Sequence, residues 1–137
     1  MNAKTENRQK TEAPEQIMTR TVAYADREDD LRNASWKPHP LFAGVWLKLV
    51  ISGADTGGAL SCHLVRVDPG CCLESHVHDA QWELHEVLAG LGVARIAGRG
   101  ADYFPGRAAV IPKGTKHEVR AGDQGLTLCA KFFPALA

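Results

Sequence analysis

The feature that most constrains the fold of this chain is an even rhythm of short apolar runs. From residue 41 onward, runs rich in valine, leucine and isoleucine alternate with segments of glycine, proline and aspartate. The runs are FAGVWLKLVI, ALSCHLVRV, CLESHVH, ELHEVLA, GVARIA, RAAVIP, HEVRA and LTLCAKFF. The segments between them are SGADTGG, DPG, AGLG, AGRGADYFPG, PKGTK and AGDQG, which have the composition of tight turns. Many short strands separated by turns predict an all-β fold, an antiparallel sandwich or barrel.

The N-terminal end follows a different pattern. Residues 1–16 are polar and contain Pro14, which predicts a mobile arm. Residues 17–24 (IMTRTVAY) alternate apolar and polar side chains, as an edge strand does, and residues 26–34 (DREDDLRNA) have room for at most one or two helical turns. Because 137 residues fit one domain, we expect a single domain over residues 17–137 behind the arm.

Charge and hydropathy exclude several classes of partner. Sixteen basic residues balance sixteen acidic ones, so nothing in the overall charge attracts nucleic acid or anionic lipid, and we expect a small-molecule partner. No stretch approaches eighteen consecutive apolar residues, and the N-terminus lacks the apolar core of a signal peptide, which predicts a cytoplasmic protein without a membrane span. The four cysteines show no CxxC spacing, so we expect reduced, buried thiols.

The polar residues gather in one stretch. Residues 70–90, GCCLESHVHDAQWELHEVLAG, hold three of the six histidines together with three glutamates. His76 and His78 are two apart, and side chains at that spacing on a strand share a face about 7 Å apart, close enough to converge on one cation. Glu83 begins the next apolar run, and an antiparallel return can bring its carboxylate opposite the histidine pair. His117 follows the turn PKGTK and is the fourth candidate ligand.

This spacing resembles that of the cupin superfamily. Residues 70–90 satisfy the first cupin motif, with five residues between Gly70 and His76, one before His78, four before Glu83 and six before Gly90. Residues 106–121 satisfy the second motif through its histidine, since Gly106, Pro112, Gly114 and His117 stand at the expected intervals. Ala121 replaces the usual final asparagine, which is not a metal ligand in the family. The fifteen residues between the motifs resemble the short spacer of compact microbial cupins.

The resemblance implies a fold, a metal and an assembly. The fold is an antiparallel double-stranded β-helix, a jelly-roll barrel with the metal in its mouth. The ligands are His76, His78, Glu83 and His117, around one divalent transition metal, which nitrogen and oxygen ligands leave open among Zn, Fe, Mn, Ni and Co. Four ligands leave coordination positions for water or substrate, unlike a closed, cysteine-rich structural zinc site. Small cupins often pair through an N-terminal strand, so we expect a homodimer.

Two further acidic or basic groups near the ligands are candidates for proton transfer. His85 shares strand parity with Glu83 and should face the barrel interior, as a neighbour of the ligands, a substrate contact or a general base. Glu74 lies two residues before His76, where either the site or the rim is open to it. Glu86 has the opposite parity and is expected to be solvated or to lie in an interface.

The sequence pattern does not decide which side chains contact a substrate. His63 and Arg66 lie on opposite faces of one run, and because both faces are mixed, parity does not decide which of the two faces the cavity. Arg95 has the same ambiguity, and Trp82 is one of several aromatics that can line a pocket or pack in an interface. His39 lies in a proline-rich connection and is expected to be inert.

Two functions from different classes fit this pattern. The first is a metal-dependent enzyme, of dioxygenase, isomerase or lyase type, that acts on a small organic acid, phenolic or sugar-like substrate. The second is a non-catalytic metal- or ligand-sensing module, because SWKPHP, GVWLKLV and LVRVDPG look like the cupin half of zinc-binding anti-sigma factors. The N-terminal residues have neither a cysteine nor a useful helical pattern for binding a sigma factor, so this alternative is a stand-alone sensor.

Overall fold

The computed structural model describes residues 21–137. The predicted arm, residues 1–16, and the first half of the predicted strand at 17–24 lie outside the described residues. The described chain is almost entirely β-structure, with one short 3-10 helix, η1 (Gly53–Thr56). The strands are β1 (Thr21–Ala23), β2 (Glu28–Asp30), β3 (Lys37–Pro38), β4 (Val45–Ile51), β5 (Ser61–Val67), β6 (Cys72–His76), β7 (Trp82–Ile96), β8 (Arg99–Tyr103), β9 (Ala108–Ile111) and β10 (His117–Phe133).

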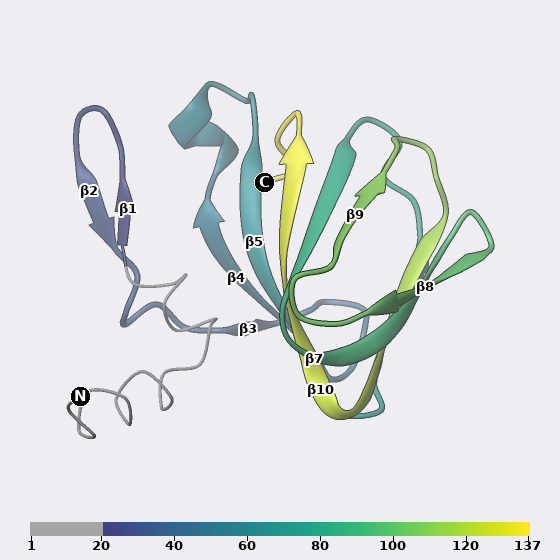
Figure 1. The fold of residues 1–137 in the computed structure, drawn as a ribbon. Coiled ribbons are helices and arrows are strands. Elements are labelled where there is room, and N and C mark those ends of the chain that lie inside the picture. Colours follow the sequence, from purple (N-terminus) through teal and green to yellow (C-terminus); the bar gives the residue numbers. More distant parts are fainter. Residues whose placement is uncertain (1–20) are drawn as a thin grey trace, which may run out of the picture.

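Two long strands organise the barrel. β7 and β10 pair with each other in antiparallel register along most of their length. The second half of β10 also pairs with β5 and its first half with β6, while β7 pairs with β9 near its start and with β8 near its end. The sheet order is β3-β4-β5-β10-β7-β8, and Figure 1 shows these strands curving round into a barrel with the β1–β2 hairpin to one side. This confirms the all-β, antiparallel jelly-roll barrel predicted from the sequence.

Two predicted turns are absent from the described chain, and the strands run through them. AGLG lies inside β7 and AGDQG inside β10, so four predicted strands form two long ones. Gly90 has φ +81°, and a Cβ there would collide with the carbonyl oxygen of Gly125 across the strand pair. The register shifts between Ala121 and Leu126 at the same place. The glycines therefore bend the paired strands together instead of reversing them, because a close backbone approach at positive φ excludes a side chain.

Two other local predictions are wrong. The segment 97–106, predicted as a turn, contains β8, which pairs with β7 from Gly92–Tyr103 to Ile96–Arg99 and buries the Tyr103 ring. The segment predicted as one or two helical turns, 26–34, contains β2, which pairs with β1. Aspartates are poor helix formers, and here they bond to nearby arginines, Asp29 to Arg27 and Asp30 to Arg32.

The barrel separates two hydrophobic clusters. The larger one fills the interior with inward side chains of β4 to β10, including Val65, Val87, Leu128 and Phe132. The smaller one, on the outer face of β4, β5 and β10, contains Cys62 and Cys129 and is covered by side chains of the β1–β2 region and by Trp36. All four cysteines are free thiols as predicted, but Cys71 and Cys72 are only half-buried. Among the described residues, no helix is long and apolar enough to cross a membrane.

Candidate metal centre

Strand pairing brings two of the four candidate ligands together. His76 is the last residue of β6, His117 is the first residue of β10, and the two are register partners. Their ring centroids are 4.2 Å apart. The turn PKGTK therefore does what its sequence indicates, because it delivers His117 at the start of a strand that pairs with the first motif.

The other two ligands reach the site by different routes. His78 lies beyond the end of β6, so shared strand parity does not place it; its carbonyl accepts a hydrogen bond from the Gly114 amide (2.9 Å), which ties it to the PKGTK turn. Glu83 is on β7, which pairs with β9 and β10 but not with β6, so its carboxylate reaches the site from a strand that the histidines do not share. One ligand atom from each of His76, His78, Glu83 and His117 lies within 4.8 Å of all the others.

Backbone contacts orient two of the imidazoles. His76 Nδ1 lies 2.7 Å from the Glu74 carbonyl, and His117 Nδ1 lies 2.9 Å from the Thr115 carbonyl. A carbonyl only accepts, so each Nδ1 carries the proton and donates it, which leaves each Nε2 with a free lone pair directed to the site. Metal-binding histidines are commonly held in this way.

The centre contains buried polar atoms without hydrogen-bond partners. Glu83 Oε1 and His117 Nε2 lie 3.1 Å apart, are inaccessible to water and have no hydrogen-bond partner in the described structure. Leaving such atoms unpaired costs free energy unless a ligand satisfies them. A divalent cation accepts lone pairs from both atoms at once, so the residues present fit a bound metal.

The protonation states also suit a cation. Burial alone would raise the pKa of Glu83, but the imidazoles of His117 and His85 outweigh it and hold that pKa well below its ordinary value. Burial lowers the pKa of both His76 and His78. Burial also acts to lower the pKa of His117, but the nearby Glu83 carboxylate outweighs it and raises that pKa, so a metal competes with a proton at His117. An ionised carboxylate and neutral imidazoles, as at His76 and His78, are the forms that bind metal.

A buried hydrogen-bond chain stands behind Glu83. Tyr103 Oη lies 2.8 Å from His85 Nδ1, and His85 Nε2 lies 2.5 Å from Glu83 Oε2. Because the carboxylate only accepts, His85 donates from Nε2 and accepts at Nδ1 from the tyrosine hydroxyl. His85 and Tyr103 are each 1% exposed. Glu83 thus has one oxygen fixed by His85 and the other, Oε1, left for a metal.

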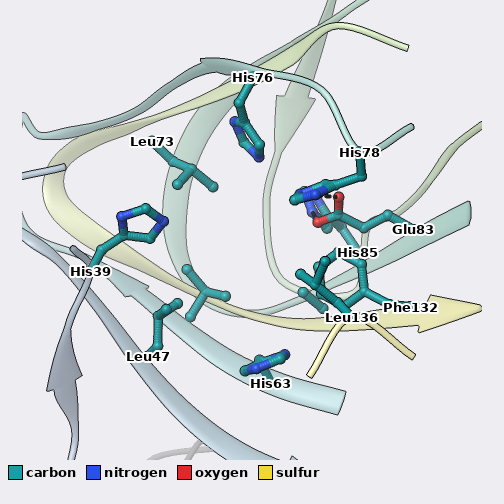
Figure 2. A pocket seen from close by; sticks show the side chains of 12 residues that line it. His39, Leu47, His63, Leu73, His76, His78, Glu83, His85, Phe132 and Leu136 are labelled. Carbon is teal, nitrogen blue, oxygen red and sulfur yellow. Dashed lines mark hydrogen bonds and ion pairs between the residues drawn. The ribbon is translucent and has the colours of Figure 1, made fainter. Parts of the chain in front are cut away.

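A cavity of about 100 Å³ opens beside the ligands. Figure 2 shows His76, His78, Glu83 and His85 on one side and His63 and Leu47 on the opposite side. The structure therefore settles the ambiguity on β5, where His63 lines the cavity and Arg66 does not. Arg66 instead lies over the rings of Trp36 and Trp46, 4.7 and 5.9 Å from their centroids.

The remaining predicted contacts lie away from this cavity. Arg95 is exposed and bonds to the Gly98 carbonyl (3.1 Å). Trp82 is 46% exposed. The Glu74 side chain is exposed as well, and its backbone carbonyl, not its carboxylate, contacts His76. None of these three side chains is among those lining the cavity.

Several residues that line the cavity were not predicted from the sequence. His39, expected to be inert, lines the cavity, and its Nδ1 accepts hydrogen bonds from the Leu41 and Phe42 amides. Phe132 and Leu136 reach the cavity from the C-terminal end of the chain. The alternation along β10 is a signal for Phe132, since it shares parity with buried Leu128 and Ala130, but no pattern marks His39 or Leu136.

Comparisons with known proteins give a fold likeness. No protein-family model matches the chain, and no curated protein sequence matches it. Solved structures do resemble it. KdgF from Halomonas sp. superposes with a TM-score of 0.65 at 23% identity, over 73% of this chain and 86% of that one. A predicted oxalate decarboxylase from Thermotoga maritima gives a TM-score of 0.65 at 20% identity, over 73% and 90%.

A third likeness bears on the type of domain. A cupin-2 domain protein from Rhodospirillum rubrum superposes with a TM-score of 0.65 at 20% identity, over 72% of this chain and 68% of that one. At such identities a structural likeness establishes the fold and leaves the activity to the site.

Proposed function

We propose that this chain, which has the cupin fold, is a metal-dependent enzyme that binds one divalent transition metal and acts on a small organic molecule in the adjacent cavity. The observation that carries the proposal is the pair of buried, unpartnered atoms, Glu83 Oε1 and His117 Nε2, within 4.8 Å of ligand atoms of His76 and His78. Zn, Fe, Mn, Ni and Co all suit such a set of nitrogen and oxygen atoms.

The charge of the site favours an anionic ligand at the metal. Three neutral imidazoles and one carboxylate leave a divalent cation with a net charge of +1, and they fill four of five or six coordination positions. A bound metal would supply Lewis acidity to a carbonyl, enolate, phenolate or carboxylate oxygen. The chain itself supplies the orientation of the ligands and a largely apolar cavity wall beside them.

Neither of the two predicted proton shuttles, His85 and Glu74, presents a free group to the cavity, and the reasons differ. Both ring nitrogens of His85 are engaged, one by Glu83 and one by Tyr103, so we assign His85 to positioning Glu83. The Glu74 carboxylate is exposed and outside the cavity lining. His63, whose Nδ1 is buried without a partner, is the better placed of the predicted polar residues to contact a bound molecule.

Metal content tests the proposal. Purified chain, stripped with a chelator and reloaded with each of the five metals in turn, should hold about one metal per chain by elemental analysis after gel filtration. The double variant His76→Ala/His117→Ala should lose it. His39→Ala is the matched control, since His39 lines the cavity but is not among the four ligands. Full metal occupancy in a folded double variant would refute the proposal.

A non-catalytic metal- or ligand-sensing module is the second candidate, and one observation favours it. Of the two predicted proton shuttles, neither presents a free group to the cavity. Turnover distinguishes the candidates. Acids, phenols and sugars are incubated with protein loaded with each metal, and product formation that depends on His117 supports the enzyme. Tight binding without product supports the sensor.

A further inference from the structure

The cavity beside the metal centre is polar at one end and apolar elsewhere. The polar end consists of three of the ligands, His76, His78 and Glu83, together with His85, on one side of the view in Figure 2. The apolar lining comes from four strands, β4, β5, β6 and β10, and from the C-terminal segment: Leu47, Val65, Leu73, Ala130, Phe132 and Leu136. The Phe132 ring packs against both ends, 5.2 Å from the centroid of His78 and 5.8 Å from that of His63. A molecule bound at the metal therefore extends over hydrocarbon.

Away from the metal end, two imidazoles are the polar groups of the described lining. His39 Nδ1 is already engaged by two backbone amides. His63 is partly buried, and burial lowers its pKa, so it is neutral near pH 7. Within residues 21–137, no lysine or arginine lines the cavity, and Glu83 is its one charged side chain.

Strand alternation turns the nearby cations outward. On β4 and β5, Leu47, His63 and Val65 face the cavity. Their neighbours Lys48 and Arg66 point to the other face, where both lie over the Trp36 ring. The wall opposite the metal is therefore uncharged because of the register of these two strands.

This distribution of charge restricts the ligand. The metal with its four ligands has a charge of +1, which one anionic oxygen neutralises. A second anionic group would lie against the apolar wall without a cationic partner, and desolvating an unpaired charge is costly. The cavity is also small, since a 150 Å³ engineered cavity in another protein holds one benzene ring.

We propose that the cavity binds a compact molecule with a metal-binding oxygen, or an adjacent pair of oxygens, at one end and an uncharged, mainly apolar body of about one ring. Phenols, catechols and enolised ketones are of this class, whereas dicarboxylates, sugar acids and phosphate esters are not. The inference rests on the proposed metal site and narrows the substrate class within it.

Two probes with the same metal-binding head test the inference. 4-Methylcatechol and 3,4-dihydroxybenzoate differ only in the group opposite the chelating oxygens, a methyl in one and a carboxylate in the other. Each probe is titrated anaerobically into the Co²⁺-loaded chain, and binding is measured by calorimetry and by the visible spectrum of cobalt. The affinity of each probe for the loaded chain is then divided by the affinity of the same probe for free Co²⁺. We expect at least tenfold tighter normalised binding of the methyl compound.

A pair of lysine variants provides the matched control. Leu136 and Leu49 are each 42% exposed, but only Leu136 lines the cavity. Leu136→Lys should bring a cation to the apolar wall and shift the preference toward the carboxylate compound by at least tenfold. Leu49→Lys should leave the preference unchanged. Because both leucines are surface-exposed, both variants are expected to fold.

The outcomes separate this inference from the proposed function. The inference is overturned if the unmodified chain binds the carboxylate compound as tightly as the methyl compound or more tightly, after normalisation. It is also overturned if neither probe binds. In both cases one Co²⁺ per chain would still support the metal site. Failure to bind Co²⁺ overturns both. A preference in the expected direction that Leu136→Lys does not alter also overturns the inference, because the wall would then not be its cause.

Discussion

Replacing Tyr103 by phenylalanine tests whether the buried chain behind Glu83 positions the metal ligand. The substitution removes one hydroxyl and leaves the ring, so the core loses only the volume of one oxygen atom. The hydroxyl lies 2.8 Å from His85 Nδ1, and both residues are 1% exposed, so no water can replace it without a rearrangement. An unsatisfied buried acceptor of this kind costs about 1 to 3 kcal/mol of unfolding free energy.

The same substitution should weaken metal binding. Without the tyrosine hydroxyl, the His85 ring loses the contact that fixes its tautomer and orientation, and Glu83 Oε2 loses its fixed donor. Changes to groups that orient metal ligands typically lower metal affinity by about 10- to 100-fold. We therefore expect at least a tenfold loss, which corresponds to about 1.4 kcal/mol.

Two measurements are needed. Urea unfolding of the metal-free variants gives the stability change, and competition with a chromophoric chelator gives the metal affinity. Tyr24→Phe is the matched control, since its hydroxyl makes a surface contact with Asp55 (3.3 Å). It should change stability by less than about 0.5 kcal/mol and leave metal affinity alone. If Tyr103→Phe lost stability but bound metal like the unmodified chain, the reasoning about Glu83 would be refuted.

Three further predictions follow from the structure. Gly90→Ala should destabilise the fold by about 3 kcal/mol, because it adds both backbone strain and a collision with Gly125. Gly58→Ala is the control, since Gly58 has a similar φ but open space around it, and should cost only about 1 to 2 kcal/mol. Equal losses of unfolding free energy in urea would contradict the close approach of Gly90 and Gly125. Chelator treatment of metal-loaded protein should lower its stability by about 2.7 kcal/mol if the metal had been present at 100 times its dissociation constant, and an unchanged melting temperature would argue against a metal in the folded state. Burial lowers the pKa of His63 from its ordinary value of 6.5, so its contribution to stability is fully present above pH 6.5 and is lost below it, as the unfolded chain takes up the proton. In metal-free protein, His63→Phe should reduce the slope of unfolding free energy against pH by up to about 1.4 kcal/mol per pH unit. An identical slope would contradict this prediction.

Much of the fold was predictable because its signals are local. Apolar runs and turn residues report how each short segment folds, so most strands of the barrel were located from them. The errors share one cause, which is strand pairing that residue type alone does not reveal. AGLG and AGDQG look like turns, yet Gly90 and Gly125 meet across β7 and β10 and keep both strands continuous. The glycine-rich segment 97–106 becomes β8 because the end of β7 offers it a partner.

The candidate site was also only partly predictable from the sequence. Motif spacing singled out His76, His78, Glu83 and His117 from the sequence, and the fold brings these four together. Spacing could not reveal that His78 is placed by a loop contact with Gly114, or that His39 lines the cavity. Those contacts depend on which segments become neighbours in space.

The sequence by itself therefore determined the class of fold and the set of atoms available to a metal, since both depend on residue type and on intervals along the chain. Only the tertiary structure decided the polarity of the cavity around them. On β5 the alternation of side chains presents either His63 or Arg66 to the interior, and both choices suit a strand with two mixed faces. In the folded chain His63 occupies the inner face and Arg66 lies over Trp36 and Trp46 on the outer face. The outer face provides aromatic rings for the guanidinium group, whereas among the described residues the only carboxylate lining the cavity is that of the metal ligand Glu83.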